Sequence, residues 1–416
     1  MSINRRQFLT FLGVSFAGGA VAYNWPHEGL LNPCPGTPVP DDLLNHDVVL
    51  AAWEGIDPAL YRDVHTHLLG AGDGDSGIYL HPTMQDIFTP AQYIRFKFYI
   101  NASCAENENG IDIGYVNQLK QHMSSFSVGA KAMLLAFDFN HDELGVANKD
   151  KSPFYTPNTY VKKIAKENPD WFEWIASIHP YREDCVEELE KAVKGGATAV
   201  KWLPPVMGID PSSKKCVRFY EAMAKYNIPL LTHAGDEHAV HGVELQANGN
   251  PLLLRRALDK GVRVIVAHCA SEGVGIDLDR GHTDKSLTNF ELFARLMDDK
   301  QYEGRLFGEI SAMTQLNRIG PALKTVLSRD DWHHRLLNGS DYPLPGVMPL
   351  FSTQTLHEAG YLEEKYVEPL KAIRPFNPML YDFVLKRHLS WQGKRFATTI
   401  FESKSFFDEN KTISTE

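Results

Sequence analysis

The chain has 416 residues, of which 43% are hydrophobic and 23% are charged. This is an ordinary globular composition, and the length suits one large barrel with insertions or two modest domains. The net charge of −10 argues against non-specific nucleic-acid binding, which needs clustered Lys and Arg side chains.

The first residues are typical of an export signal. Arg5 and Arg6 precede an uncharged apolar run from Phe8 to Ala22, which ends on a small-residue cleavage pattern. We therefore expect residues 1–22 to be a twin-arginine signal, read by the twin-arginine export machinery, and the protein to be periplasmic or otherwise extracytoplasmic. The alternative is an uncleaved N-terminus that anchors the protein in the membrane.

The cysteines do not form a recognisable disulfide framework. They are odd in number, widely spaced and include no CxxC pair. We interpret them mainly as buried, small apolar residues. They are Cys34, Cys104, Cys185, Cys216 and Cys269.

Residues 23–58 are expected to form a surface linker rich in Pro and Gly, followed by a short helix. Beyond them, short apolar runs alternate with amphipathic ones. The expected strands are 63–70, 128–138, 174–180, 197–203, 228–233, 262–268, 306–310 and 335–339, and the expected helices include 184–194, 217–225, 251–260, 287–298, 321–327 and 377–388.

Eight strands that alternate with helices predict an α/β fold with parallel strands, and a closed sheet of this kind is a (β/α)₈ TIM barrel. An open doubly wound sheet is the main competitor, but no glycine-rich turn follows the first strand. We expect the barrel at residues 59–395 and a C-terminal tail at 396–416, with disorder in the last residues.

His65 and His67 lie two residues apart in the first strand, so their side chains point to the same face. Two converging imidazoles are the beginning of a metal site. So short a pattern also occurs by chance or on a solvent-facing strand, and further ligands are needed to decide.

Further polar residues recur at the carboxyl ends of later strands. Lys201, His233 and His268 are spaced by 32 and 35 residues, and Asp341 follows 73 residues later. A barrel of about 250 residues repeats its strand–helix unit at roughly this interval, and its active site lies at the carboxyl ends of its strands. The spacing therefore predicts that these side chains meet His65 and His67 at one metal centre.

Together these motifs resemble the amidohydrolase superfamily. The resemblance is strongest to the metal-dependent hydrolase branch that includes aminocarboxymuconate semialdehyde decarboxylase-like proteins, and it spans residues 63–388. The motifs are His65-x-His67, Ala-Val-Lys201-Trp-Leu, Leu-Thr-His233-Ala-Gly, Val-Ala-His268-Cys and Asn-Gly-Ser-Asp341-Tyr-Pro. The resemblance implies one or two divalent metal ions, usually zinc, bound on a (β/α)₈ barrel.

The resemblance also implies roles for these residues. His65, His67 and His233 would be metal ligands, and Asp341 would be both a ligand and the catalytic acid/base. His268 would bind a second metal ion or orient the attacking water. Lys201 would be carboxylated and bridge two ions; its alternative role is to bind a substrate anion or to pair with a nearby acid.

Two further residues are candidates for substrate binding. Arg182 follows the strand 174–180, so it could hold a substrate carboxylate through two hydrogen bonds, or else be an ordinary surface residue. His238 lies in an acidic loop after the strand 228–233 and could line the pocket. The long insertion between His67 and the end of the second strand is expected to cap the active site.

The expected function is metal-dependent hydrolysis of an amide, ester or lactone in a small-molecule substrate. The main alternative is metal-dependent, non-oxidative decarboxylation on the same scaffold, since a fold does not fix the chemistry. A third reading is a non-catalytic periplasmic protein that binds a metal or ligand. A homodimer remains open, because no interface can be read from the sequence.

Overall fold

The computed structural model describes residues 28–106, 108–240, 245–280 and 286–408. The expected export signal at 1–22 and the last residues of the expected tail lie outside these ranges. Within the described ranges, no helix is long and apolar enough to cross a membrane.

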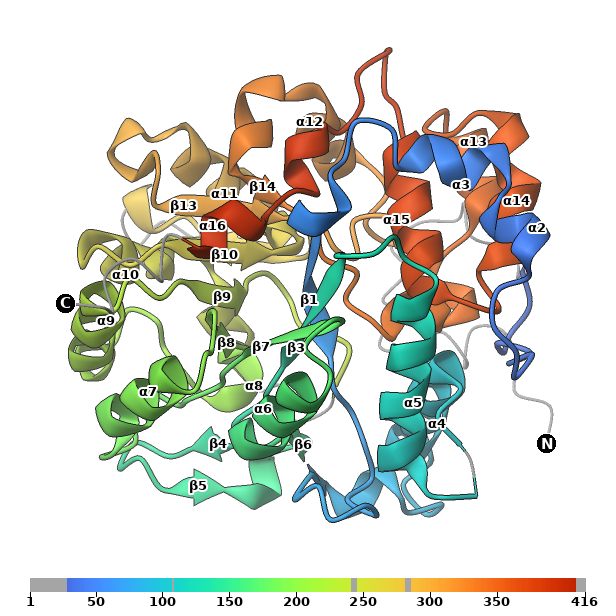
Figure 1. The fold of residues 1–416 in the computed structure, drawn as a ribbon. Coiled ribbons are helices and arrows are strands. Elements are labelled where there is room, and N and C mark those ends of the chain that lie inside the picture. Colours follow the sequence, from blue (N-terminus) through green and yellow to red (C-terminus); the bar gives the residue numbers. More distant parts are fainter. Residues whose placement is uncertain (1–27, 107, 241–244, 281–285, 409–416) are drawn as a thin grey trace.

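Eight parallel strands of the described chain form a closed TIM barrel, as predicted (Figure 1). The two parts of the sheet join at two places. At one of them Ala176 pairs with Val200. At the other, the amide of Val64 donates to the carbonyl of Asn338 and the amide of His67 donates to that of Tyr342, both at 3.0 Å. In order around the barrel the strands are β1 (Arg62–His67), β3 (Lys131–Leu135), β7 (Phe172–Ile175), β8 (Val200–Trp202), β9 (Leu230–His233), β10 (Val264–Ala267), β13 (Leu306–Glu309) and β14 (Leu336–Leu337).

A helix returns the chain from each strand to the next, and amphipathic sequences supply these helices. α7, for example, buries Cys185, Leu189 and Ala192 on one face while its Glu and Lys residues face outward. The helices that follow β3 to β14 are α6 (Asn158–Glu167), α7 (Cys185–Lys194), α9 (Val217–Lys225), α10 (Arg255–Asp259), α11 (Asn289–Asp298), α12 (Pro321–Ser328) and α15 (Pro378–His388).

Alternate strand residues fill the barrel interior. Val64, Met133, Ile175 and their counterparts on other strands form one buried cluster, which also contains Phe407. Phe407 lies in α16 (Lys404–Asp408), which follows the barrel in the sequence. The described part of the expected C-terminal tail, residues 396–408, therefore contributes Phe407 to the barrel core.

The segment before the barrel forms two short helices, α2 (Asp41–Leu44) and α3 (Asp47–Ala52). Upstream of them the chain is fixed to the body at two places. Glu28 pairs with the buried guanidinium of Arg374 at 2.7 Å, and Cys34 is disulfide-bonded to Cys104. The interpretation of the cysteines as simple buried residues was thus wrong for this pair, because the fold brings together two cysteines 70 residues apart; it is confirmed for Cys185, Cys216 and Cys269, which are free and buried.

The insertion between β1 and β3 covers the carboxyl-terminal end of the barrel. It contains β2 (Tyr79–Leu80), α4 (Pro90–Ser103) and α5 (Ile111–Ser124), and the two helices lie side by side in Figure 1. β2 pairs with β6 (Phe154–Tyr155) of a second excursion, which also holds β4 (Asn140–His141) and β5 (Ala147–Asn148). The remaining described elements are α8 (Pro204–Met207), β11 (Val274–Ile276), β12 (Ser286–Thr288), α13 (Thr353–Glu358) and α14 (Val367–Ile373), together with short 3₁₀ turns.

Candidate metal centre

All six predicted ligands lie around one cavity at the carboxyl ends of the strands. Each reaches it from the position that the strand periodicity predicts. β1 supplies two of them, β8 and β9 one each, and the loops that follow β10 and β14 supply the others. They are His65, His67, Lys201, His233, His268 and Asp341.

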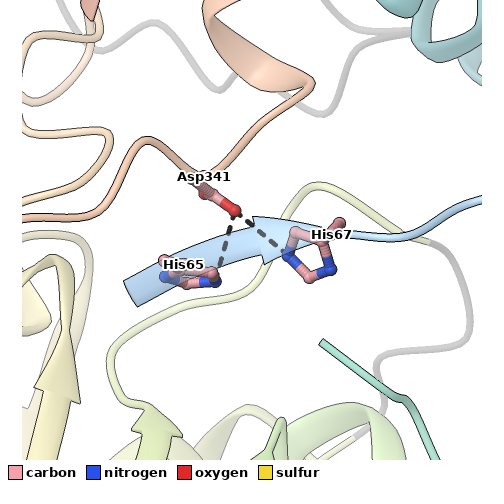
Figure 2. Close-up of side chains that lie close together, drawn as sticks. All are labelled: His65, His67 and Asp341. Atoms are coloured by element: carbon pink, nitrogen blue, oxygen red, sulfur yellow. Dashed lines mark ion pairs between the residues drawn. The ribbon is translucent and has the colours of Figure 1, made fainter. Parts of the chain in front are cut away.

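The tightest group consists of His65, His67 and Asp341 (Figure 2). Nε2 of His65 and Nε2 of His67 lie 3.3 and 3.1 Å from the same carboxylate oxygen, Oδ1 of Asp341. Asp341 has left-handed backbone geometry, with φ of 58°, and its amide donates to the His65 carbonyl at 2.8 Å. Gly339 allows this loop to approach β1, because a Cβ there would lie 2.6 Å from both the His65 Cβ and Glu309 Oε1.

Glu309, at the end of β13, fixes the orientation of His65. Its Oε2 lies 3.1 Å from Nδ1 of His65 and accepts a 2.7 Å hydrogen bond from the Ser311 hydroxyl. A carboxylate can only accept, so Nδ1 of His65 carries the proton and the neutral ring presents the lone pair of Nε2 to Asp341. Carboxylates orient metal-binding histidines in this way. Glu309 is not among the candidate site residues predicted from the sequence.

His233 and His268 complete the ring of imidazoles. His268 faces Asp341 with Nε2, 3.7 Å from Oδ2, while its Nδ1 lies 2.8 Å from the Ser311 hydroxyl. His233 directs Nδ1 toward Oε2 of Glu237 at 3.5 Å. Its Nε2 is buried and has no hydrogen-bond partner among the described residues. An orphaned buried nitrogen of this kind is expected at a ligand position.

Burial keeps His65, His233 and His268 neutral, which is the form of imidazole that binds metal. Desolvation lowers the pKa of His65 and of His268 well below the ordinary histidine value. It is also the largest of the effects that lower the pKa of His233 to about 3. These three histidines therefore do not need to lose protons at neutral pH before they can coordinate an ion.

Lys201 lies at the centre of the cluster, with Nζ 3.0 Å from Nε2 of His65. Burial lowers the pKa of its ammonium to about 8, against the opposing attraction of Asp341, Glu309 and Glu237. Burial therefore makes the unprotonated amine more accessible near neutral pH than it is in a solvent-exposed lysine.

The structure does not bring the two predicted substrate-binding residues into the cavity. Arg182 is occupied by the carboxylates of Asp184 and Asp138, at 2.8 and 3.2 Å, and lies at a separate surface hollow. The ring of His238 is turned toward Glu272, 4.0 Å away. Both residues follow the predicted strands, but their side chains point away from the cavity, which sequence position alone could not reveal. Glu237, beside His238, does line it.

The insertion forms the outer wall of the cavity, as predicted. Phe96 and Tyr99 from α4 and Leu80 from β2 face the ring of ligands. Tyr99 also donates a 2.5 Å hydrogen bond to the carbonyl of Ala239 in the loop after β9, which links the insertion to the barrel rim. Tyr115 supports the floor, since its hydroxyl donates to the His67 carbonyl at 2.9 Å.

Comparison with known proteins identifies a family. The family model described as amidohydrolase matches residues 63–352, which contain every predicted ligand. A comparison with curated proteins finds no match.

Three solved structures that resemble this chain carry different descriptions. An uncharacterised TIM-barrel protein from Bordetella bronchiseptica is 14% identical (TM-score 0.43), with 76% of this chain and 94% of that chain covered. A 4-oxalomesaconate hydratase from Rhodopseudomonas palustris is 16% identical (TM-score 0.40), with 76% of this chain and 95% of that chain covered. A 5-carboxyvanillate decarboxylase from Novosphingobium aromaticivorans, complexed with manganese, is 11% identical (TM-score 0.44), with 84% of this chain and 96% of that chain covered.

Proposed function

We propose that this chain, which belongs to the amidohydrolase family, is a metal-dependent enzyme that hydrolyses an amide, ester or lactone of a small molecule. The observation that carries the proposal is the convergence of His65 and His67 on one oxygen of Asp341, with His233 and His268 facing the same cavity.

The side chains of the centre fit a divalent cation. Nε2 of His65 presents a lone pair to Oδ1 of Asp341, so two acceptors face each other at 3.3 Å. A cation between them would convert this repulsion into two bonds. The ammonium of Lys201 reaches only the His65 side of this pair, and Nε2 of His233 has no hydrogen-bond partner in the described chain. Four imidazoles with one carboxylate favour zinc, and we propose one or two zinc ions here.

A bound zinc ion would polarise the substrate carbonyl and lower the pKa of a coordinated water to about 7. Asp341 would accept a proton from the attacking water and then deliver it to the leaving group. Burial raises the pKa of Asp341, but the neighbouring imidazoles and the ammonium of Lys201 outweigh burial, so the net pKa is lowered. Asp341 is therefore ionised at neutral pH and ready to act as a base.

His268 and Lys201 have supporting roles in this proposal. His268 directs Nε2 toward the second oxygen of Asp341 and would either bind a second ion or orient the attacking water. The unprotonated amine of Lys201 would add to CO₂ and release a proton to give a carbamate, whose oxygens would join the metal ligands. Its burial and its pKa of about 8 support this reaction, which requires the neutral amine.

The test is metal analysis of the purified protein, together with its intact mass under non-denaturing conditions. We expect bound zinc, and a mass increase of one CO₂ where two ions are present. His65→Ala should lose both metal and turnover of an ester, lactone and amide panel. His334→Ala removes an exposed histidine at the other end of the barrel and should retain both. A His65→Ala variant with full metal content and turnover would refute the assignment.

Turnover and metal content also distinguish the proposed hydrolase from a decarboxylase and from a binding protein. Release of CO₂ from a panel of carboxylic acids, with no turnover of esters, lactones or amides, would identify a decarboxylase instead. Full metal content without turnover of either panel would favour a binding protein.

We also propose that the protein is exported through its twin-arginine N-terminus. The disulfide between Cys34 and Cys104 supports this proposal, because structural disulfides persist mainly in oxidising compartments outside the cytoplasm.

A further inference from the structure

The cavity outside the metal centre is lined almost entirely by hydrocarbon. The insertion contributes Leu80, Met84 and Phe96, and the barrel loops contribute Phe154, Leu203 and Leu344. These side chains come from at least four separate segments of the chain. The apolar wall is therefore assembled by the tertiary structure and is not the product of one hydrophobic stretch.

The polar groups of this wall are already bonded within the protein. The Thr156 hydroxyl donates to the Leu68 carbonyl at 3.0 Å, and the Tyr99 hydroxyl donates to the Ala239 carbonyl. Glu237 accepts from the Ala239 amide and lies against His233. A substrate tail in this space would meet no uncommitted hydroxyl donor from Thr156 or Tyr99.

In the part of the chain that the structure describes, the wall also carries no positive charge apart from the metal centre. Among the described lining residues the only Lys or Arg is Lys201, whose ammonium lies against His65. Arg182, the expected partner for a substrate carboxylate, is paired with Asp184 and Asp138 elsewhere. Among the described lining residues, the one other acidic group outside the candidate ligands is the carboxyl of Glu237, which offers no positive charge to an anion.

From this lining we infer that the part of the substrate remote from the reacting carbonyl is uncharged and apolar. The inference rests on the proposed function and narrows it to lipophilic esters, lactones or amides with an alkyl or aryl tail. A carboxylate on that tail would be desolvated without a partner, which is strongly unfavourable, whereas each buried methylene strengthens binding about fourfold.

Binding of metal-chelating probes tests the inference without turnover. Hexanohydroxamic acid and adipic acid monohydroxamate share a chelating end and differ in an apolar or a carboxylate terminus. Titration calorimetry on the zinc-loaded protein should show the alkyl probe binding at least about tenfold more tightly. A matched pair of substrates, 4-nitrophenyl pentanoate and mono-4-nitrophenyl glutarate, should differ in kcat/KM in the same direction.

A wall variant shows whether the tail occupies this space. Leu80→Arg supplies the missing cation and should shift the preference at least tenfold toward the carboxylate probe, while the neutral polar variant Leu80→Gln should not reverse it. Equal or tighter binding of the carboxylate probe by the native protein would overturn the inference while leaving the metal centre intact. An unchanged preference for the alkyl probe in a folded Leu80→Arg variant would also overturn the inference and leave the metal centre intact. A protein that binds neither probe and holds no zinc would refute the proposed function, and the inference with it.

Discussion

Nδ1 of His65 lies 3.1 Å from Oε2 of Glu309, and this contact decides which nitrogen of His65 faces Asp341. Glu309 is fully buried and also accepts from the Ser311 amide and hydroxyl. It therefore joins β13 to β1 behind the candidate ligands.

Glu309→Gln should weaken metal binding without unfolding the barrel. The amide retains the shape of the carboxylate but loses its charge, and its amino group can donate to Nδ1, which favours the wrong tautomer of His65. We expect zinc affinity to fall about 10- to 100-fold, as for other residues that orient metal ligands. Competition with a zinc chelator measures the change. Glu303→Gln, an exposed change just before β13, is the control, and equal affinities for both variants would contradict the role of Glu309.

The disulfide between Cys34 and Cys104 should stabilise the protein, because it holds the N-terminal segment against the end of α4. Asn32 and Asn101 reinforce the junction with mutual hydrogen bonds of 2.8 and 2.9 Å. A cross-link across 70 residues restricts the unfolded chain, and its loss typically costs about 2 to 4 kcal/mol. Cys34→Ser should unfold at lower denaturant concentration and show no further loss with reductant, unlike the native protein.

Thiol counting gives an independent check of the same bond. The denatured, unreduced protein should show only the thiols of Cys185, Cys216 and Cys269. Reaction of all the cysteines before reduction would mean that the bond is absent from the purified protein.

His122 should make the folded protein sensitive to mild acid. Its ring is buried in α5 beside Tyr342, neither nitrogen has a hydrogen-bond partner among the described residues, and burial lowers its pKa to about 3. In the unfolded chain the His122 imidazole takes up a proton near pH 6.5, whereas in the folded protein it stays neutral. His122 therefore leaves the free energy of unfolding unchanged above that pH and lowers it below that pH. At pH 5 the loss is about 2 kcal/mol.

Replacement of His122 by Phe should remove this part of the pH dependence. Chemical denaturation at pH 5 and pH 7.5 should show a smaller difference in unfolding free energy for His122→Phe than for the native protein. His334→Gln, at an exposed position, should retain the native difference. If His122→Phe behaves like the native protein, His122 must acquire a proton or a partner in solution.

The proposed export route predicts a specific requirement for the paired arginines. Replacing Arg5 and Arg6 by Lys should leave the full-length precursor in the cytoplasm, because the export machinery reads the arginine pair and not positive charge alone. Cell fractionation and immunoblotting measure this, with Asn4→Gln as the control. Normal export of the double Lys variant would show that another signal directs the protein.

Several parts of this protein could be read from the sequence because they depend on local periodicity. Alternation along a strand places His65 and His67 on one face, and amphipathic spacing marks α7 and α9. The strand–helix interval places Lys201 within the short strand β8 and His233 at the end of β9, and both line the same cavity.

Other features were decided only by the tertiary structure, because they join segments that are far apart in the chain. The approach of Glu309 to His65 and of Cys34 to Cys104 depends on how the barrel closes and how the insertion folds back over it. Arg182 follows its strand as expected, yet its side chain pairs with Asp184 and Asp138 and does not line the cavity. The direction of a loop side chain depends on its ionic partners, which local sequence spacing does not reveal. Strand periodicity thus determined which end of the barrel holds the metal ligands, while long-range packing determined the cavity around them, because a pocket wall is assembled from residues that share no local pattern.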